Sequence, residues 1–237
     1  MTKLASLKKE LQQLADPEKA KFLPQFFKAY PGGYGEGDRF IGVKVPDQRQ
    51  VAKKYYQQLS LTEVKELLQE PIHEYRQTAL FMLTEKYKRA EDEAAAEKIV
   101  RLYLENTAYI NNWDLVDCSA DKILGAYFFT RSKETLYRLA RSNNLWEQRM
   151  AIMATFYFIK QGFFSDTLQI AEILLQHPHD LIHKAVGWML REGGKRDYQV
   201  EYDFLKQHYR GMPRTMLRYA IEKFSPEVRQ QFLKGTI

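Results

Sequence analysis

Several features are scarce in this chain of 237 residues, and each scarcity excludes a class of protein. Cys118 is the only cysteine, so an internal disulfide is impossible and a reducing compartment is expected. The longest apolar region, residues 150–159, is broken by Thr155 and is far shorter than the roughly 20 residues of a membrane span. Residues 1–16 are charged and amphipathic, unlike a signal peptide. We therefore expect a soluble cytoplasmic protein without a membrane partner.

Signatures of metal and nucleotide binding are also missing. Of the five histidines, His179 and His183 have helical i,i+4 spacing, but no third ligand follows at a suitable distance. Residues 31–38 contain four glycines without the G-x-G-x-x-G order and without a preceding strand, so they are no dinucleotide fingerprint. This loop is either a flexible connector or a segment whose backbone approaches a ligand closely. We expect no metal and no other cofactor.

Basic residues are present in excess, with 36 Lys and Arg against 30 Asp and Glu and a net charge of +6. Such a charge is compatible with a polyanionic partner but does not establish one. Many of the cations fall after residue 180, whereas residues 91–97 are locally acidic.

Apolar residues recur at helical spacing along the whole chain, and no strand-like alternation competes with them. The caps and breakers between these segments predict a series of helices joined by short turns. The predicted helices are 4–14, 18–30, 47–59, 61–69, 73–88, 91–105, 113–128, 133–142, 145–161, 163–176, 181–192, 197–209, 213–224 and 226–234.

Alternate helices carry a repeat. Small or β-branched residues occupy similar places at spacings of 37, 35, 34 and 35, namely at Ala79, Val116, Ala151, Ala185 and Ala220. A period in this range predicts a helical solenoid, in which stacked helix pairs share one core and form a concave surface. We predict an all-α fold, a solenoid of antiparallel helix pairs in a single domain, residues 1–237.

This register singles out one carboxylate. The position after the small residue is aliphatic in four repeats and acidic at Asp117; the five residues are Leu80, Asp117, Ile152, Val186 and Ile221. A carboxylate in an apolar setting is costly, so it requires a partner or a task. Two positions before the small residue all five are polar, as expected for a row facing solvent or a ligand: Gln77, Asp114, Arg149, His183 and Arg218.

The segment before that carboxylate is organised as a helix start. Asn112 is suited to accept a backbone N–H of the first turn. Trp113 and Asp117 are four residues apart, so they share a helix face. Alternatively, Trp113 is a core residue and Asp117 caps a helix or pairs with a nearby cation.

The three tryptophans, Trp113, Trp146 and Trp188, lie in or beside this row of helices, and two of them lie near cations. Lys184, Trp188 and Arg191 occupy one helix face, and Trp146 precedes Arg149 by three residues. Aromatic rings between cations suit a nucleic acid with its phosphates, sugars and bases. The alternative is tryptophans in the inter-helix core with the cations extending over them.

Three runs carry a resemblance: 112–117, 145–151 and 184–192, together with Phe40-Ile41-Gly42, Pro46 and Arg49. In this order they resemble the AlkD-type family of HEAT-like-repeat DNA alkylation-repair glycosylases, over nearly the whole chain. The resemblance implies an α-solenoid that holds duplex DNA in a concave basic groove. We expect a monomer that binds double-stranded DNA containing alkylated bases.

The resemblance also implies roles for particular residues. It places the catalytic carboxylate at Asp117, the sugar-packing tryptophans at Trp113 and Trp188, and a phosphate-contacting arginine at Arg149. Further DNA contacts are assigned to Lys44, Trp146, Lys184 and Arg191. The implied reaction is hydrolysis of the N-glycosidic bond of cationic N3- or N7-alkylated purines. The family is notable for not needing a base-sized pocket.

The chain departs from the family's best-known catalytic branch. The glycine-rich insertion 31–38 is absent there, tyrosine stands near Phe26, glutamine stands at Lys44, and a pair of phenylalanines is more typical within 180–183. Two other functions therefore stay open: a non-catalytic protein that binds damaged or branched DNA, and a protein-binding solenoid.

Overall fold

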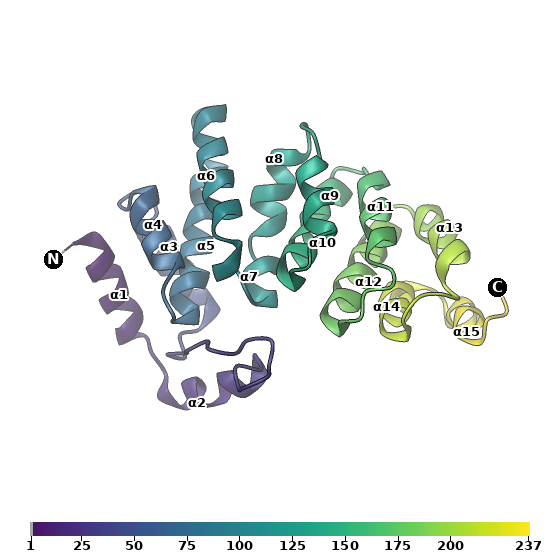
Figure 1. Ribbon diagram of the computed structural model, residues 1–237, viewed down its shortest axis with the longest axis horizontal. Coiled ribbons are helices and arrows are strands. Elements are labelled where there is room, and N and C mark those ends of the chain that lie inside the picture. The colour runs from purple at the N-terminus through teal and green to yellow at the C-terminus, as the bar shows by residue number, and fades with distance from the viewer. Residues whose placement is uncertain (1) are drawn as a thin grey trace. The chain divides into compact units, whose positions relative to one another are not determined.

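The computed structural model describes residues 2–237, and these residues form helices and turns without a β-strand (Figure 1). Within residues 2–237, an isolated bridge joins Arg39 to Ile72. Over the same residues, no helix combines the length and the apolarity that crossing a membrane requires. The all-α prediction is confirmed.

The chain divides into two compact units, one ending at Ile123 and the other beginning at Leu124. In the first unit a row of helices forms in which each helix packs on the next: α1 (Lys3–Gln13), α3 (Val45–Tyr55), α5 (His73–Lys88) and α7 (Trp113–Asp117). Two further helices pack on α5, namely α4 (Leu61–Leu68) and α6 (Glu93–Glu105). The helix α2 (Pro17–Phe26) and the glycine-rich loop lie beside the ends of α3 and α5 (Figure 1).

The second unit repeats this arrangement. Its central row consists of α10 (Leu145–Lys160), α12 (Asp180–Gly194) and α14 (Arg214–Ala220). Partner helices pack against that row: α8 (Ala126–Phe128), α9 (Glu134–Ala140), α11 (Ser165–Ile173) and α13 (Tyr198–His208). The helix α15 (Pro226–Lys234) follows at the end of the chain. Each unit is a stack of helix pairs, which confirms the solenoid prediction; a groove along the whole chain and a single domain stay predictions.

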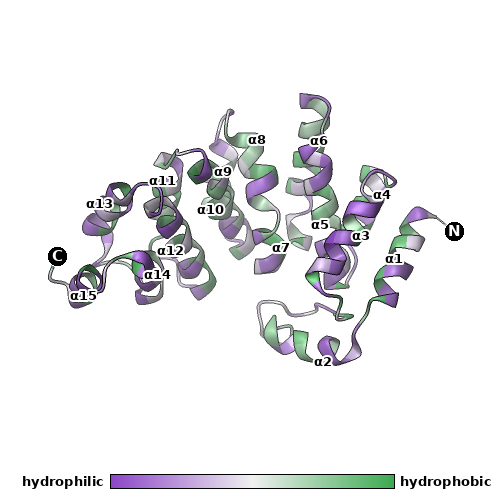
Figure 2. Ribbon diagram, turned by 180° about the vertical axis from the view of Figure 1, so that it is seen from behind, coloured by the Kyte–Doolittle hydropathy of each residue, from purple (hydrophilic) through white to green (hydrophobic). Residues whose placement is uncertain are grey.

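The repeat register is confirmed residue by residue. The small residues at 79, 116, 151, 185 and 220 are all fully buried in the central rows. At the next position the four aliphatic residues are buried, whereas Asp117 is half-buried. Hydrophobic and hydrophilic segments alternate along the helices, as expected for helices with one buried face (Figure 2). Close packing explains Gly187, because a Cβ atom there would lie 2.5 Å from the carbonyl oxygen of Met216 on α14.

The predicted helix 113–128 is wrong as one element. The α-helix ends at Asp117, a π-helical turn covers Asp121–Gly125, and α8 follows. Ser119 donates to the carbonyl of Leu115 at 2.6 Å, a hydroxyl-to-backbone bond of the kind that bends helices. The Tyr103 hydroxyl lies 2.9 Å from the same Ser119 hydroxyl and secures the bend. The break limits α7 to five residues and leaves Asp117 at its last position.

Candidate functional site

The start of α7 forms as predicted. Asn112 is fully buried, and its side-chain oxygen accepts the N–H of Trp113 at 2.9 Å. Trp113 and Asp117 line the same cavity, so their common face is confirmed. The cavity measures about 420 Å³, within the range of small-molecule sites. We call it the outer cavity; its lining comprises Phe26, Phe27, Val45, Arg49, Gln77, Phe81, Trp113, Asp114, Asp117 and Cys118.

Trp113 is both packed and accessible. Its ring stacks on Phe27 with centroids 5.4 Å apart, and Phe26 meets its edge at 6.0 Å. The side chain nevertheless stays half-exposed at the cavity wall. Packing therefore fixes the orientation of the indole while leaving ring surface available to a ligand.

A buried ion network supports this wall from behind. His73, at the first position of α5, is 2% exposed and lies between two carboxylates. Its Nδ1 is 2.9 Å from Asp38 and its Nε2 is 2.8 Å from Asp114. A neutral imidazole donates from only one nitrogen, so this arrangement requires the cation. Gln77 donates a second bond to Asp114 at 2.8 Å, and Arg76 pairs with Asp38.

The pKa values follow from this geometry. Burial opposes the charge of His73, but the nearby carboxylates of Asp114 and Asp38 outweigh burial and raise its pKa to about 9. Burial also opposes ionisation of Asp38, but its bonds with His73 and Arg76 hold its pKa below the usual value. At neutral pH the network therefore contains cationic His73 between anionic partners.

The glycine-rich loop positions Asp38 in this network. A Cβ atom at Gly35 would lie 2.4 Å from the carbonyl of Phe27 and 3.0 Å from the Asn112 amide, so the loop packs tightly on the start of α7. The next residues are tied to α5, because the N–H of His73 donates to the carbonyl of Arg39 at 2.8 Å. The loop is thus a structural part of the site, which the flexible-connector interpretation missed.

The outer cavity brings two carboxylates and a guanidinium together. Asp114 is 12% exposed and already hydrogen-bonded, whereas Asp117 is half-buried at the end of the helix. Arg49 stacks over the Phe81 ring at 4.0 Å on another wall. A cavity with two carboxylates and an electron-rich indole suits a centre that carries or develops positive charge.

In the second unit, Trp188 is half-exposed on α12. Its indole N–H donates to Glu192 at 3.2 Å, and Lys195 donates to the same carboxylate oxygen at 2.6 Å. The predicted cations on its face have acidic partners, since Lys184 lies 2.7 Å from Asp180 and Arg191 pairs with Glu222. The face predicted from spacing exists, but its two cations are already paired.

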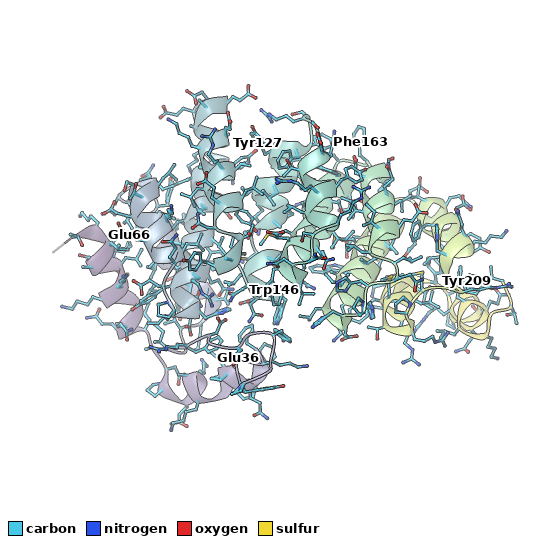
Figure 3. All side chains as sticks on the ribbon, viewed as in Figure 1. Glu36, Glu66, Tyr127, Trp146, Phe163 and Tyr209 are labelled. Atoms are coloured by element: carbon cyan, nitrogen blue, oxygen red, sulfur yellow. The ribbon has the colours of Figure 1, made fainter. Side chains whose placement is uncertain are left out.

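Two predicted surface residues are buried. Trp146 is 8% exposed at the first turn of α10 (Figure 3). Arg149 is 5% exposed and donates to the carbonyl of Leu181 at 2.5 Å. The register row that was expected to face solvent or a ligand is mixed: Gln77 and Arg149 are buried, Asp114 and His183 are half-buried, and Arg218 is exposed. Gln77 and Asp114 line the outer cavity. The burial of Trp146 agrees with the alternative of a tryptophan in the inter-helix core. The DNA contacts of Trp146 and Arg149 stay predictions.

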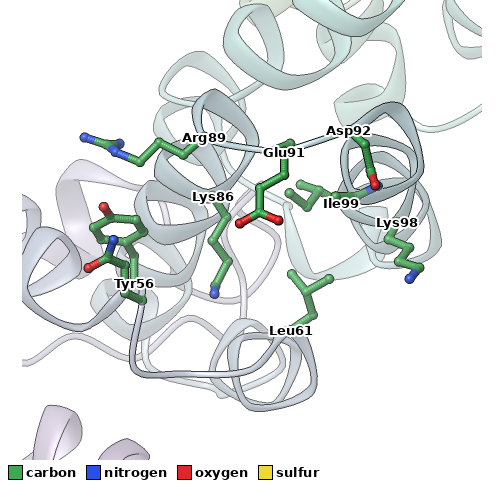
Figure 4. A pocket seen from close by; sticks show the side chains of 11 residues that line it. Tyr56, Leu61, Lys86, Arg89, Glu91, Asp92, Lys98 and Ile99 are labelled. Atoms are coloured by element: carbon green, nitrogen blue, oxygen red, sulfur yellow. The ribbon is translucent and has the colours of Figure 1, made fainter.

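Lys44 is exposed at the residue before α3, where it lines a second, smaller cavity beside the outer one. Its predicted contact with DNA stays a prediction. A third cavity of about 360 Å³ lies at the opposite end of α5, where Lys86 and Glu91 extend into it (Figure 4). None of the catalytic or DNA-binding residues that the sequence predicted lines this third cavity.

Comparison with known proteins assigns the family. The profile described as DNA alkylation repair enzyme matches residues 7–224, which is most of the chain. The chain belongs to the DNA alkylation repair enzyme family. Among curated proteins, none matches this sequence.

Solved structures agree in fold. A protein from Enterococcus faecalis, described as a predicted DNA alkylation repair enzyme, shares 16% identity and aligns with a TM-score of 0.68 over 90% of this chain and 97% of its own. AlkD2 from Streptococcus mutans also shares 16% identity, with a TM-score of 0.54 over 88% of this chain and 99% of its own. At this identity the likeness establishes the helical fold of the family. A role in DNA alkylation repair follows from the family match, whereas the reaction has to be argued from the site.

Proposed function

We propose that this protein is a DNA glycosylase that hydrolyses the N-glycosidic bond of cationic N3- or N7-alkylated purines in duplex DNA. The observation that carries the proposal is the outer cavity, where the half-buried carboxylate of Asp117 and the packed indole of Trp113 share one wall. Membership of an alkylation-repair family supports the same proposal.

The chemistry suits these groups. An alkylated purine is already cationic and leaves readily, so little general acid is needed. Positive charge then develops on the deoxyribose, where anionic Asp117 stabilises it and orients the attacking water. The electron-rich face of Trp113 complements the same charge. Asp114 is proposed to reinforce the negative potential while its bonds with His73 and Gln77 hold α7 in place.

Another route to alkylation repair is transfer of the alkyl group to a cysteine, and the cavity does contain Cys118. That route needs a thiolate as nucleophile. Burial raises the pKa of the Cys118 thiol to about 12, and its sulfur contacts the carbonyl of Leu115 at 3.4 Å. The thiol is therefore protonated at neutral pH, which favours hydrolysis over alkyl transfer.

Non-catalytic binding of damaged or branched DNA is the second candidate. It is favoured by the glycine-rich loop, which is absent from the family's best-known catalytic branch and here packs on the start of α7 and bonds to His73 through Asp38.

Release of alkylated purines from methylated duplex DNA, separated by chromatography, distinguishes these candidates. We expect the wild-type protein to release 3-methyladenine or 7-methylguanine. Binding of the same duplex without release of either base contradicts the proposed reaction and supports the second candidate.

Replacement of the two tryptophans of the second unit separates function from packing. We expect Trp188→Ala to slow base release while the protein stays folded, because this side chain is half-exposed. The control is Trp146→Ala, which removes a buried ring and is expected to destabilise the fold by about 3–5 kcal/mol. Base release and thermal unfolding by circular dichroism are measured for both. If Trp188→Ala unfolds the protein like the control, Trp188 is a core residue.

A further inference from the structure

The third cavity lies at the end of α5 that carries Lys86, and no residue of the outer cavity lines it. The segment after α3, the start of α4 and the start of α6 complete its walls. Its volume of about 360 Å³ falls in the range of small-molecule sites. A cavity of this size has room for one small metabolite.

Most charged groups of its lining already have partners. Arg89 pairs with Glu85 and stacks over the Tyr56 ring at 5.0 Å. Asp92 caps α6, because its carboxylate accepts the backbone N–H of Ala95 at 2.7 Å. These side chains shape the walls, and a ligand would have to compete for their charges.

Lys86 and Glu91 are different. Both side chains extend into the cavity (Figure 4), and neither forms a hydrogen bond or an ion pair with a residue that the structure describes. Glu63 attracts Lys86, but the carboxylate of Glu63 accepts the backbone N–H of Ser60 at 2.8 Å. Lys98 also lines the cavity, but it is exposed and extends away from the other two (Figure 4). The interior therefore presents one ammonium and one carboxylate that are available to a ligand.

The ammonium of Lys86 is poorly stabilised in its surroundings. The residue is half-buried, and burial lowers its pKa below the usual value although the attraction of Glu63 acts in the opposite direction. A partly desolvated charge without a hydrogen bond is costly, and charge-assisted bonds to a carboxylate are among the strongest that an ammonium forms. Lys86 therefore favours a ligand with a carboxylate.

The remaining lining restricts the ligand further. Like charges repel, so Glu91 disfavours a purely anionic ligand and Lys86 disfavours a purely cationic one. Leu61, Tyr56 and Ala95 are half-buried and add apolar surface to the walls. An aliphatic group that covers this surface is favoured, because it removes the surface from water. The cavity suits a small zwitterion with an aliphatic part.

We propose that the third cavity binds a free α-amino acid with an aliphatic side chain, its carboxylate on Lys86, its ammonium on Glu91 and its side chain against Leu61. An α-amino acid carries these three groups on one carbon atom, so one small molecule meets all three contacts. The inference is independent of the proposed function, since it uses no residue of the outer cavity.

The test compares three ligands of the same carbon skeleton on the full-length protein without DNA. L-Leucine carries both charges, 4-methylpentanoate lacks the ammonium, and 3-methylbutylamine lacks the carboxylate. Binding is measured at pH 7 by NMR titration of the backbone amides around the cavity. We expect leucine to bind about tenfold more tightly than either of the other two, as expected for one charge-assisted hydrogen bond.

Two substitutions assign the two charges. Lys86→Met is expected to weaken leucine and 4-methylpentanoate about tenfold while leaving 3-methylbutylamine unweakened. Glu91→Gln is expected to weaken leucine and 3-methylbutylamine about tenfold while leaving 4-methylpentanoate unweakened. The matched control is Lys88→Met, at an exposed position of α5 outside the lining, which should change none of the three. Neither Lys86 nor Glu91 is fully buried, so the variants should fold, which circular dichroism verifies.

The outcomes decide the inference without reference to DNA. Absence of leucine binding at about 10 mM overturns it. Equal affinity of leucine and 4-methylpentanoate shows a site for anions only and also overturns it, as does equal behaviour of Lys86→Met and Lys88→Met. Release of alkylated purines is a separate measurement, so the failure of one proposal leaves the other standing.

Discussion

Asp117→Asn is expected to reduce release of alkylated purines by about 100- to 1,000-fold, the usual effect of removing one electrostatic stabiliser of a transition state. The substitution is nearly isosteric at a half-buried position, so cavity and overpacking costs are small. The lost charge matters most when the glycosidic bond is breaking, and interactions that strengthen in the transition state govern the chemical rate. Single-turnover release from methylated duplex DNA measures the effect.

Asp203→Asn is the matched control, because Asp203 is an exposed carboxylate on α13. We expect it to leave release unchanged and both variants to unfold at nearly the wild-type temperature. DNA binding by Asp117→Asn should be equal or slightly tighter, since a carboxylate repels phosphates. An unfolded Asp117→Asn protein would show that the carboxylate has a structural task. Normal release by this variant would exclude Asp117 from the reaction.

The stability of the protein is expected to fall between about pH 6.5 and pH 9 through His73. Its pKa is 6.5 in a free side chain and about 9 in the fold, so the folded state retains a proton that the unfolded chain loses. This contribution is fully present below pH 6.5 and is lost as the pH rises through 9. At 1.36 kcal/mol for each pKa unit, it amounts to about 3 kcal/mol.

His73→Gln isolates this contribution. The variant should be destabilised at pH 6 by about 3–5 kcal/mol, because Asp38 and Asp114 lose their buried cation. Its disadvantage relative to wild type should shrink by about 3 kcal/mol at pH 9.5, measured by urea unfolding at several pH values.

Glu201 also lowers the stability of the protein as the pH rises, because burial raises its pKa to about 8. This contribution is the same in wild type and His73→Gln, so it cancels in the difference between them. The control His208→Gln replaces a histidine that has neither carboxylate of this network beside it. Parallel pH curves for wild type and His73→Gln would contradict the cationic network.

The repeat shows how far local pattern predicts this molecule. Ala79, Ala151 and Ala185 were placed by spacing alone and are fully buried. Spacing works here because stacked helix pairs bury the same face in every repeat. Spacing could not predict the burial of Trp146 and Arg149, because the periodicity of a helix does not show how deeply a neighbouring helix covers its side chains.

The break after Asp117 could not be predicted from the sequence either. Periodicity predicted an unbroken helix over 113–128, while Ser119 bonded to Leu115 and Tyr103 ends it early. Tyr103 comes from the preceding helix, so the contact that secures this bend exists only after α6 has packed.

By itself the sequence determined the all-helical class, the repeat, the Asn112 cap and the shared face of Trp113 and Asp117, because each depends on residues within about one helical turn or on a regular period. Only the tertiary structure decided that Asp38 and Asp114 enclose His73 and that the glycine-rich loop packs on the start of α7. Asp38 and Asp114 lie 35 and 41 residues from His73 along the chain. No local pattern links positions so far apart; they meet because the glycine-rich loop folds back on the starts of α5 and α7. The carboxylates beside His73 then keep it cationic against the effect of burial.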